Sequence, residues 1–340
     1  MKIGIVNDLP MAVEALKRAL MLKPGHQVIW VAKDGAEAVD LCAKTTPDLV
    51  LMDMIMPGMD GVETTRRIMT QSPCAILIVT VSVGANASRV FEAMGHGALD
   101  AVDTPAFGLG DLSDSASPLL AKLETIQKLI SDKNGNSSAM ERASRQALAS
   151  RGESLLAIGA SAGGPAALTT LLSGLPKDFS AAVVIIQHVD AQFASGMAEW
   201  LALSSKLPVR VAKEGERPEP GVVLLAGTND HLALKASDRL GYTPKPADYA
   251  YRPSVDVFFQ SACRFWPGTV VGVLLTGMGR DGALGLKALR NKGHYTIAQD
   301  QATSAVYGMP KAAAKLDAAV DILALEQITP KLINIFANKT

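Results

Sequence analysis

The sequence predicts two α/β domains in series, each built on a parallel sheet. Short apolar runs of strand length alternate with segments whose apolar residues recur at helical spacing, which is typical of repeated βα units. The length of 340 residues is about that of two ordinary domains. A hydrophobic content of 48% with only 19% charged residues provides aliphatic surface for two cores and excludes a disordered chain.

The first series of βα units occupies roughly the first 130 residues. Val13, Leu16 and Leu20 are an example of the helical spacing between its strands. Five units predict a doubly wound domain with a five-stranded parallel sheet in flavodoxin-like order. The expected strands are 2–6, 27–32, 49–53, 75–80 and 99–102.

A second series begins after a polar stretch, 131–152, that is rich in Ser, Asn and charge and nearly lacks large apolar residues. This composition is typical of an interdomain linker. The second series predicts another doubly wound α/β domain, although Pro and Gly are frequent in 207–251 and indicate hairpins and loops there. The expected strands are 155–160, 181–187, 222–226, 231–235, 270–276 and 295–299.

The balance of charges indicates which partners the protein can bind, and the cysteines indicate the cellular compartment in which it works. Lysine plus arginine equal aspartate plus glutamate at 33 each, and no basic recognition helix is present, so we expect no nucleic-acid partner. Three widely spaced cysteines, Cys42, Cys74 and Cys263, indicate a reducing compartment. The apolar runs are shorter than the roughly 20 residues of a membrane span, so we expect a cytoplasmic protein without membrane insertion.

Two carboxylates follow strands of the first domain. Asp8 comes after the first strand and Asp53 ends the third, and these strands are neighbours in flavodoxin-like order. Ligands collect at this edge of such a sheet, where two carboxylates and water suit a hard cation such as Mg²⁺. Asp8 taken alone fits a helix N-cap equally well, because Pro10 and a helical run follow it.

The run LMDMIMPGMDG makes residues 1–120 resemble a two-component receiver domain. The resemblance implies that Asp53 accepts a phosphoryl group from a CheA-type histidine kinase. It further implies that Asp8 and Asp53 hold Mg²⁺ and that Thr80 is the switch hydroxyl. The sequence departs from the family at three places: Asn7 replaces an acid, Ala101 an aromatic residue, and Thr104 the lysine of a Lys-Pro pair. Loss of that lysine argues against the usual allosteric relay.

A glycine-rich strand-to-helix turn in the second domain, GASAGGP, carries Ser161. It fits G-x-S-x-G, in which a tight turn exposes a hydroxyl at a helix N-terminus. Taken alone, the turn is equally typical of a phosphate-binding loop or of a capping serine.

Two further strand ends supply complementary groups. His188 follows the apolar run AAVVIIQ, and Asp281 follows the run 270–276, so we expect both at the carboxyl edge that holds Ser161. Alone, His188 would more often be structural and Asp281 an N-cap. Together with Ser161 they form a set of nucleophile, base and orienting acid.

The stretches IGASAGGP, QH, YRPSVDVFF and LLTGMGRDGALG make the region from 155 to about 325 resemble the catalytic domain of the CheB family of chemotaxis protein-glutamate methylesterases. The resemblance implies that Ser161 is the nucleophile, His188 the general base and Asp281 its orienting acid. It implies the backbone N–H of Met278 as an oxyanion donor and no cofactor at the esterase site.

Two positions near this site depart from the family. Ala162 follows the nucleophile directly, and we expect it to support the site. It stands where the family usually has threonine, so one supporting hydrogen bond of the site is lost. His231 stands in a loop whose pattern differs, and we expect it to be structural or at the rim. The departures of the first domain, at Asn7, Ala101 and Thr104, resemble the CheB-like member of Wsp surface-sensing systems.

The expected order is a receiver domain at 1–122, a linker at 123–152 and a methylesterase domain at 153–340. It implies a phosphorylation-regulated enzyme that removes methyl esters from glutamates in the cytoplasmic domain of a methyl-accepting chemoreceptor. The same acyl chemistry would serve glutamine deamidation.

Two other functions remain open from the residues alone. An α/β-hydrolase for small esters would pair Ser161 with Asp230 or Asp281 and with His294, in the chain order of that fold. A non-catalytic response regulator would use the second domain only to bind a partner.

Overall fold

The computed structural model describes residues 1–23, 25–83, 86–105, 112–131, 153–247, 249 and 251–337. The chain divides into two compact units, Met1–Ser137 and Ser138–Thr340. In the described part of the chain, no helix is both long and apolar enough to cross a membrane. Cys42, Cys74 and Cys263 are free thiols.

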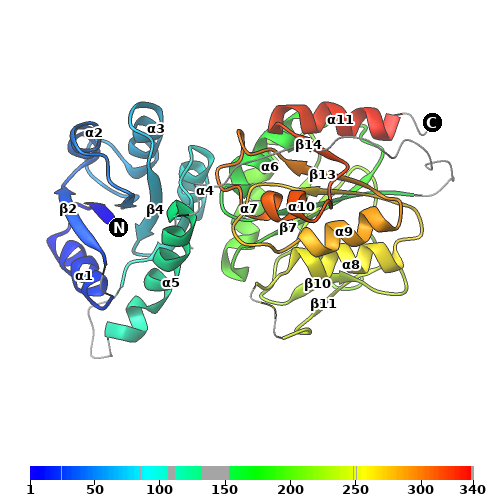
Figure 1. Cartoon of the computed structure of the whole chain (residues 1–340), viewed down its shortest axis with the longest axis horizontal. Helices are drawn as coiled ribbons and strands as arrows, with labels where there is room; N and C mark the ends of the chain where they lie inside the picture. The colour runs from blue at the N-terminus through cyan, green and yellow to red at the C-terminus, as the bar shows by residue number, and fades with distance from the viewer. Residues whose placement is uncertain are drawn as a thin grey trace. The chain divides into compact units, whose positions relative to one another are not determined.

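The first unit is a five-stranded parallel sheet in the order β2-β1-β3-β4-β5, which confirms the predicted fold. Helix α1 packs with α5 on one face, and α2, α3 and α4 pack in succession on the other (Figure 1). The central strand β3 is buried throughout because helices cover both faces. The elements are β1 (Lys2–Val6), α1 (Pro10–Met21), β2 (Gln27–Ala32), α2 (Gly35–Lys44), β3 (Leu49–Met52), α3 (Gly61–Gln71), β4 (Ala75–Thr80), α4 (Ala87–Gly95), β5 (Asp100–Asp103) and α5 (Leu112–Ser131).

Helix α5 continues past residue 122, the expected end of the first domain. Leu123 and Ile126 are buried in the core of the first unit, so this helix belongs to that unit at least through them. Leu123 and Ile126 are three positions apart, so they share one face of the helix although polar residues separate them. The rest of the expected linker, 132–152, lies outside the described residues.

The second unit is a seven-stranded parallel sheet in the order β14-β13-β12-β6-β7-β9-β8. Helix α6 packs against α7 and α11 on one face, while α8 packs against α9, and α9 against α10, on the other (Figure 1). The elements are β6 (Ser154–Ala160), α6 (Gly164–Gly174), β7 (Ala182–Gln187), α7 (Ala191–Ser204), β8 (Val209–Val211), β9 (Val223–Leu225), β10 (His231–Leu234), β11 (Leu240–Thr243), α8 (Val255–Phe265), β12 (Thr269–Leu274), α9 (Ala283–Asn291), β13 (Tyr295–Gln299), α10 (Met309–Lys315), β14 (Asp321–Leu323) and α11 (Leu325–Ala337).

The run 231–235 does not join the main sheet. It forms β10, which pairs antiparallel with β11 in a separate hairpin that packs on α8. All four residues of β10 are buried. A run of four buried residues is typical both of a strand inside a parallel sheet and of a hairpin covered by a helix, so the sequence pattern did not distinguish these two structures.

Each sheet has an internal point where its strand order reverses, and in such sheets ligands bind at the carboxyl ends of the strands at that point. In the first unit the reversal lies between β1 and β3, which precede Asp8 and Asp53. In the second it lies between β6 and β12, which precede Ser161 and Asp281, with His188 after the adjacent β7. The predicted groups are therefore assembled at two sheet edges.

Candidate active site

Ser161 lies in the turn that joins β6 to α6 and is 9% exposed. Its N–H donates to the Thr276 carbonyl oxygen at 3.1 Å, and its own carbonyl oxygen accepts from Gly164 N–H at 2.7 Å. Gly163, the residue before the helix, has φ +75°, a conformation that favours glycine. These bonds hold the serine at the N-terminus of α6, as the motif predicts.

His188 occupies the matching position on the neighbouring strand. Ala160 is paired in register with Gln187, and His188 N–H donates to the Ala160 carbonyl oxygen at 3.1 Å. His188 Nε2 lies 2.7 Å from Asp281 Oδ2, and both side chains are 7% exposed. The structure thus joins the histidine and the aspartate directly.

Asp281 is held at the N-terminus of α8. Its carboxylate accepts from Ser254 Oγ at 2.8 Å, from Val255 N–H at 2.7 Å and from Asp256 N–H at 3.1 Å. Burial opposes ionisation, yet the hydrogen bond and charge of His188 and the two amides outweigh it and lower the pKa of Asp281. An ionised Asp281 accepts a hydrogen bond from His188 Nε2–H, which leaves Nδ1 as the basic nitrogen.

His188 Nδ1 is buried and has no hydrogen-bond partner in the described chain. A buried acceptor without a hydrogen-bond partner lowers the stability of the folded state by on the order of 1–3 kcal/mol. A fold that keeps such an unpaired nitrogen indicates that the nitrogen has a function. Between Ser161 Oγ and His188, the described residues show no hydrogen bond. Such bonds are often long without substrate, and the strand register leaves the two residues side by side.

Two backbone N–H groups beside Ser161 are free. The N–H of Ala162 and the N–H of Met278 make no hydrogen bond within the described residues. A Cβ on Gly277 would lie 2.9 Å from Ser161 Cβ, so the turn that carries Met278 runs against the serine. Paired free amides next to a hydroxyl are the donors that an oxyanion needs.

The alternative set with His294 is not assembled. His294 directly precedes β13, at the amino edge of the sheet, and its Nδ1 accepts from Val270 N–H at 3.3 Å. Ser161 and His188 lie at the carboxyl edge, the length of a strand away. Asp230 is half-buried and directly precedes β10, a strand of the separate hairpin rather than of the main sheet. The α/β-hydrolase order of groups is therefore wrong for this chain.

Sequence reasoning missed the residues that support Asp281 and His188. Ser254 both caps α8, through Val257 N–H, and donates to Asp281. Its position before an amphipathic run is an N-cap signal, but nothing local shows that the cap also faces a distant carboxylate. His231 is fully buried, accepts from Ser254 N–H at 3.1 Å and is therefore structural. Tyr251 stacks on His188.

Asp256 lies in the first turn of α8, two residues after Ser254, and its burial predicts a measurable effect of pH on the stability of the fold. Burial and the charge of Asp281 raise its pKa to about 6, against the bonds from backbone amides that lower it. Because the folded state holds this proton more tightly, stability falls as pH rises from about 4 to about 6. The loss should be on the order of 2–3 kcal/mol for this group. In urea unfolding at pH 4.5 and 7, Asp256→Asn should lose less stability than the wild type, and parallel pH curves would contradict this.

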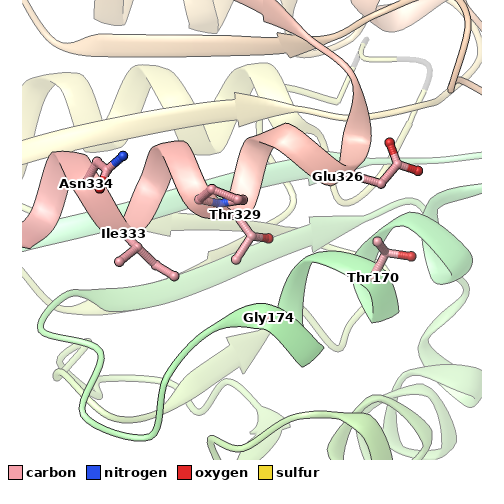
Figure 2. A pocket seen from close by; sticks show the side chains of 7 residues that line it. Thr170, Gly174, Glu326, Thr329, Ile333 and Asn334 are labelled. Carbon is pink, nitrogen blue, oxygen red and sulfur yellow. The ribbon is translucent and has the colours of Figure 1, made fainter.

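A cavity of about 470 Å³ lies elsewhere in the second unit (Figure 2). It is formed between α6 and α11, which approach closely where Thr329 Oγ1 donates to the Leu171 carbonyl oxygen at 3.0 Å. Its lining on α6 begins at Thr170, nine residues beyond Ser161 and two helical turns along α6. The cavity is therefore separate from the candidate active site.

Asp53 of the first unit is 6% exposed and hydrogen-bonded. Its carboxylate accepts from Met54 N–H at 2.6 Å and from Asn7 Nδ2 at 3.0 Å. The Asn7 oxygen accepts from Leu9 N–H instead, so Asn7 offers Asp53 a donor rather than offering a cation an oxygen. Burial, opposed by backbone amides and reinforced by the charge of Asp8, raises the pKa of Asp53.

Two acidic groups whose charges repel each other are chemically suited to a divalent cation. No three His, Cys, Asp or Glu side chains gather at one point in the part of the chain that is described. Asp8 and Asp53 are the residues that would hold Mg²⁺, which would supply charge neutralisation there.

Thr80 ends β4, beside β3, and is 1% exposed. Its hydroxyl oxygen accepts from Asn86 Nδ2 at 3.2 Å, and Asn86 also donates to the Ser82 carbonyl oxygen at 3.0 Å. Thr104, where the family has lysine, donates its N–H to the Thr80 carbonyl oxygen at 2.9 Å. Asn86 was not singled out from the sequence, because a loop asparagine alone carries no such signal.

The fold and these two sites define a response regulator whose second unit is an esterase-type α/β domain. The family model described as CheB methylesterase matches residues 156–332, and that described as response regulator receiver domain matches residues 3–113. The chain belongs to the CheB methylesterase family.

Relatives and a solved structure agree with this assignment. A Pseudomonas fluorescens protein named protein-glutamate methylesterase/protein-glutamine glutaminase 1 is 63% identical over 336 residues, 99% of each chain. A Pseudomonas aeruginosa protein with the same name and the number 3 is 60% identical over 336 residues, 99% of this chain and 100% of the relative. The crystal structure of the Thermotoga maritima CheB methylesterase catalytic domain superposes with a TM-score of 0.52 at 34% identity, covering 54% of this chain and 98% of that one.

Proposed function

We propose that this protein is a phosphorylation-regulated protein-glutamate methylesterase that releases methanol from glutamate γ-methyl esters of a chemoreceptor and also deamidates receptor glutamines. The observation that carries the proposal is the pair formed by His188 Nε2 and Asp281 Oδ2 at 2.7 Å, with Nδ1 left free beside the strand that leads into Ser161. The names of the relatives support the same substrate class.

Each group has one task in the proposed reaction. Ser161 Oγ attacks the ester carbonyl carbon while His188 Nδ1 takes the hydroxyl proton. The N–H groups of Met278 and Ala162 donate to the oxyanion, each contributing on the order of 3 kcal/mol. Asp281 stabilises the imidazolium, which then protonates the departing methoxide as methanol.

The second half of the reaction uses the same base. His188 takes a proton from water, whose oxygen attacks the acyl-serine, and then gives that proton to the departing Ser161 oxygen, which restores the serine and releases the receptor glutamate. For a glutamine substrate the leaving group is ammonia, which needs the same protonation.

The direct test is to incubate the full chain with a receptor cytoplasmic fragment that carries labelled methyl esters and to follow volatile methanol. The proposed function requires methanol release together with an equal gain of free carboxylates on the fragment. A wild-type protein that binds the fragment without releasing methanol would instead favour a non-catalytic regulator.

We further propose that Asp53 accepts a phosphoryl group from a CheA-type histidine kinase and that this raises esterase activity. Asp8 and Asp53 would hold Mg²⁺, which supplies charge neutralisation during phosphoryl transfer. Asn7 holds the Asp53 carboxylate in place at 3.0 Å, and Asn86 holds the hydroxyl of Thr80.

A small-molecule acyl phosphate with Mg²⁺ should raise methanol release by about 5- to 150-fold, the range of a coupling of 1–3 kcal/mol. Asp53→Asn should abolish the rise, because an amide cannot form the acyl phosphate, and chelation of Mg²⁺ should have the same effect. Asp48→Asn, on the exposed rim of the same unit, is the matched control. Equal activation of Asp53→Asn would contradict the proposal.

We propose that the receptor belongs to a Wsp-type surface-sensing system. Support comes from Asn7, Ala101 and Thr104, where the sequence departs from the flagellar chemotaxis pattern. Deletion of the gene should then change surface-dependent signalling and leave swimming chemotaxis intact; the reverse result would assign the protein to flagellar chemotaxis.

A further inference from the structure

The ring of Tyr251 stacks on the ring of His188. The two ring centroids are 4.3 Å apart and the planes differ by 6°. Tyr251 is half-buried, and its burial together with the negative charge of Asp281 raises the pKa of its phenol. The side chain therefore presents a neutral, flat face to the imidazole.

The phenol end of Tyr251 reaches the turn that carries the oxyanion donor. A Cβ on Gly279 would lie 3.5 Å from Tyr251 Oη, so the hydroxyl rests against the backbone between Met278 and Asp281. One side chain thus contacts both the ring of the general base and the turn beside the nucleophile.

His188 needs such a contact because its ring is held by one hydrogen bond. The Nε2 bond to Asp281 fixes one end of the imidazole, while Nδ1 has no partner within the described residues. A single bond leaves the ring free to tilt about the line that joins the two atoms. A parallel ring at stacking distance restricts that tilt.

We propose that Tyr251 is a positioning residue that keeps the His188 imidazole in the plane in which Nε2 meets Asp281 and Nδ1 stays open to Ser161. This inference rests on the proposed esterase reaction. Tyr251 also stabilises the imidazolium that forms when Nδ1 takes the proton, because a cation over an aromatic face is favourable. The effect belongs to the chemical step, so it should appear in kcat more than in KM.

The test uses the full chain with Tyr251→Phe, which keeps the stacking face, and Tyr251→Leu, which removes it. Tyr249→Leu is the matched control, because Tyr249 packs edge-on against the structural His231 at a centroid distance of 5.9 Å. With the methylated receptor fragment, Tyr251→Leu should lower kcat by about 10- to 100-fold, with KM changed less than about threefold. Tyr251→Phe and Tyr249→Leu should stay within about threefold of the wild type.

A second readout does not depend on turnover. Nitrogen-15 spectra of labelled histidines in the wild type and in Tyr251→Phe should show one His188 tautomer, with the proton on Nε2. Tyr251→Leu should show exchange between tautomers. Where Tyr251→Leu does not fold, Tyr251→Met gives similar bulk without an aromatic face and takes its place.

Two results would overturn the positioning role. Wild-type kcat with a fixed tautomer in Tyr251→Leu would show that the stack does nothing, and a loss in Tyr251→Phe as large as in Tyr251→Leu would assign the effect to the phenol hydroxyl. Absence of methanol release by the wild type would instead reject the proposed function, and the spectra would still test the stack.

Discussion

Ser161→Ala is expected to lower kcat for methanol release on the order of 1,000-fold or more. The substitution removes the attacking oxygen, and the free amides of Ala162 and Met278 that remain polarise the ester without supplying a nucleophile. The Ser161 side chain donates no hydrogen bond within the described structure, so the variant should fold normally. Steady-state kinetics on the methylated receptor fragment, with thermal unfolding of both proteins, check the prediction.

Ser173→Ala provides the matched control for this experiment. Ser173 lies near the other end of α6, is exposed and donates to the Thr170 carbonyl oxygen at 3.0 Å. Its loss should leave turnover within about twofold and stability within about 0.5 kcal/mol. Comparable rates for Ser161→Ala and Ser173→Ala would remove Ser161 from the chemistry.

Asp281→Asn should lower kcat about 10,000-fold. This is the largest effect that we expect from a substitution that removes neither the nucleophile nor the base. The amide carries no charge to stabilise the imidazolium. Its NH₂ group can also bond His188 Nε2 as a donor and move the ring proton to Nδ1, the nitrogen that must take the serine proton. The loss should therefore fall on kcat, with substrate binding retained.

A measurement of the free energy of unfolding should separate this loss of kcat from a loss of activity through unfolding. The variant removes an anion from the N-terminus of α8, where Ser254 and two amides donate to it, so a loss of about 1–3 kcal/mol is expected. Asp190→Asn is the control at the same sheet edge, because Asp190 caps α7 through Gln192 N–H and asparagine caps equally well. A rate for Asp281→Asn close to that of Asp190→Asn would show that the carboxylate does not serve His188.

The sequence predicted the positions that depend on strand order. Ser161, His188 and Asp281 each follow an apolar run, and because all these strands are parallel, their carboxyl ends share one edge. The same reasoning placed Asp8 and Asp53 together. Strand limits agreed to within two residues because a buried parallel strand is a continuous apolar run with polar residues at its end.

The remaining features depend on contacts between segments that are far apart in the chain. Ser254 meets Asp281 only because α8 begins at the edge where β12 ends, and local pattern does not encode that approach. Tyr251 stacks on His188 for the same reason, 63 positions along the chain. The end of α5 was missed because Leu123 and Ile126 stand among polar residues, and their burial is decided by tertiary packing.

The most direct test of the site is the position at which an electrophilic phosphonate that mimics the ester reacts with the full chain. Peptide mass mapping should find a single adduct on Ser161, with methanol release lost in proportion to labelling. His188→Ala should react far more slowly, because no base remains to take the hydroxyl proton. An adduct on another residue, or full turnover by a protein whose Ser161 is quantitatively labelled, would contradict the convergence of Ser161, His188 and Asp281 on one catalytic reaction.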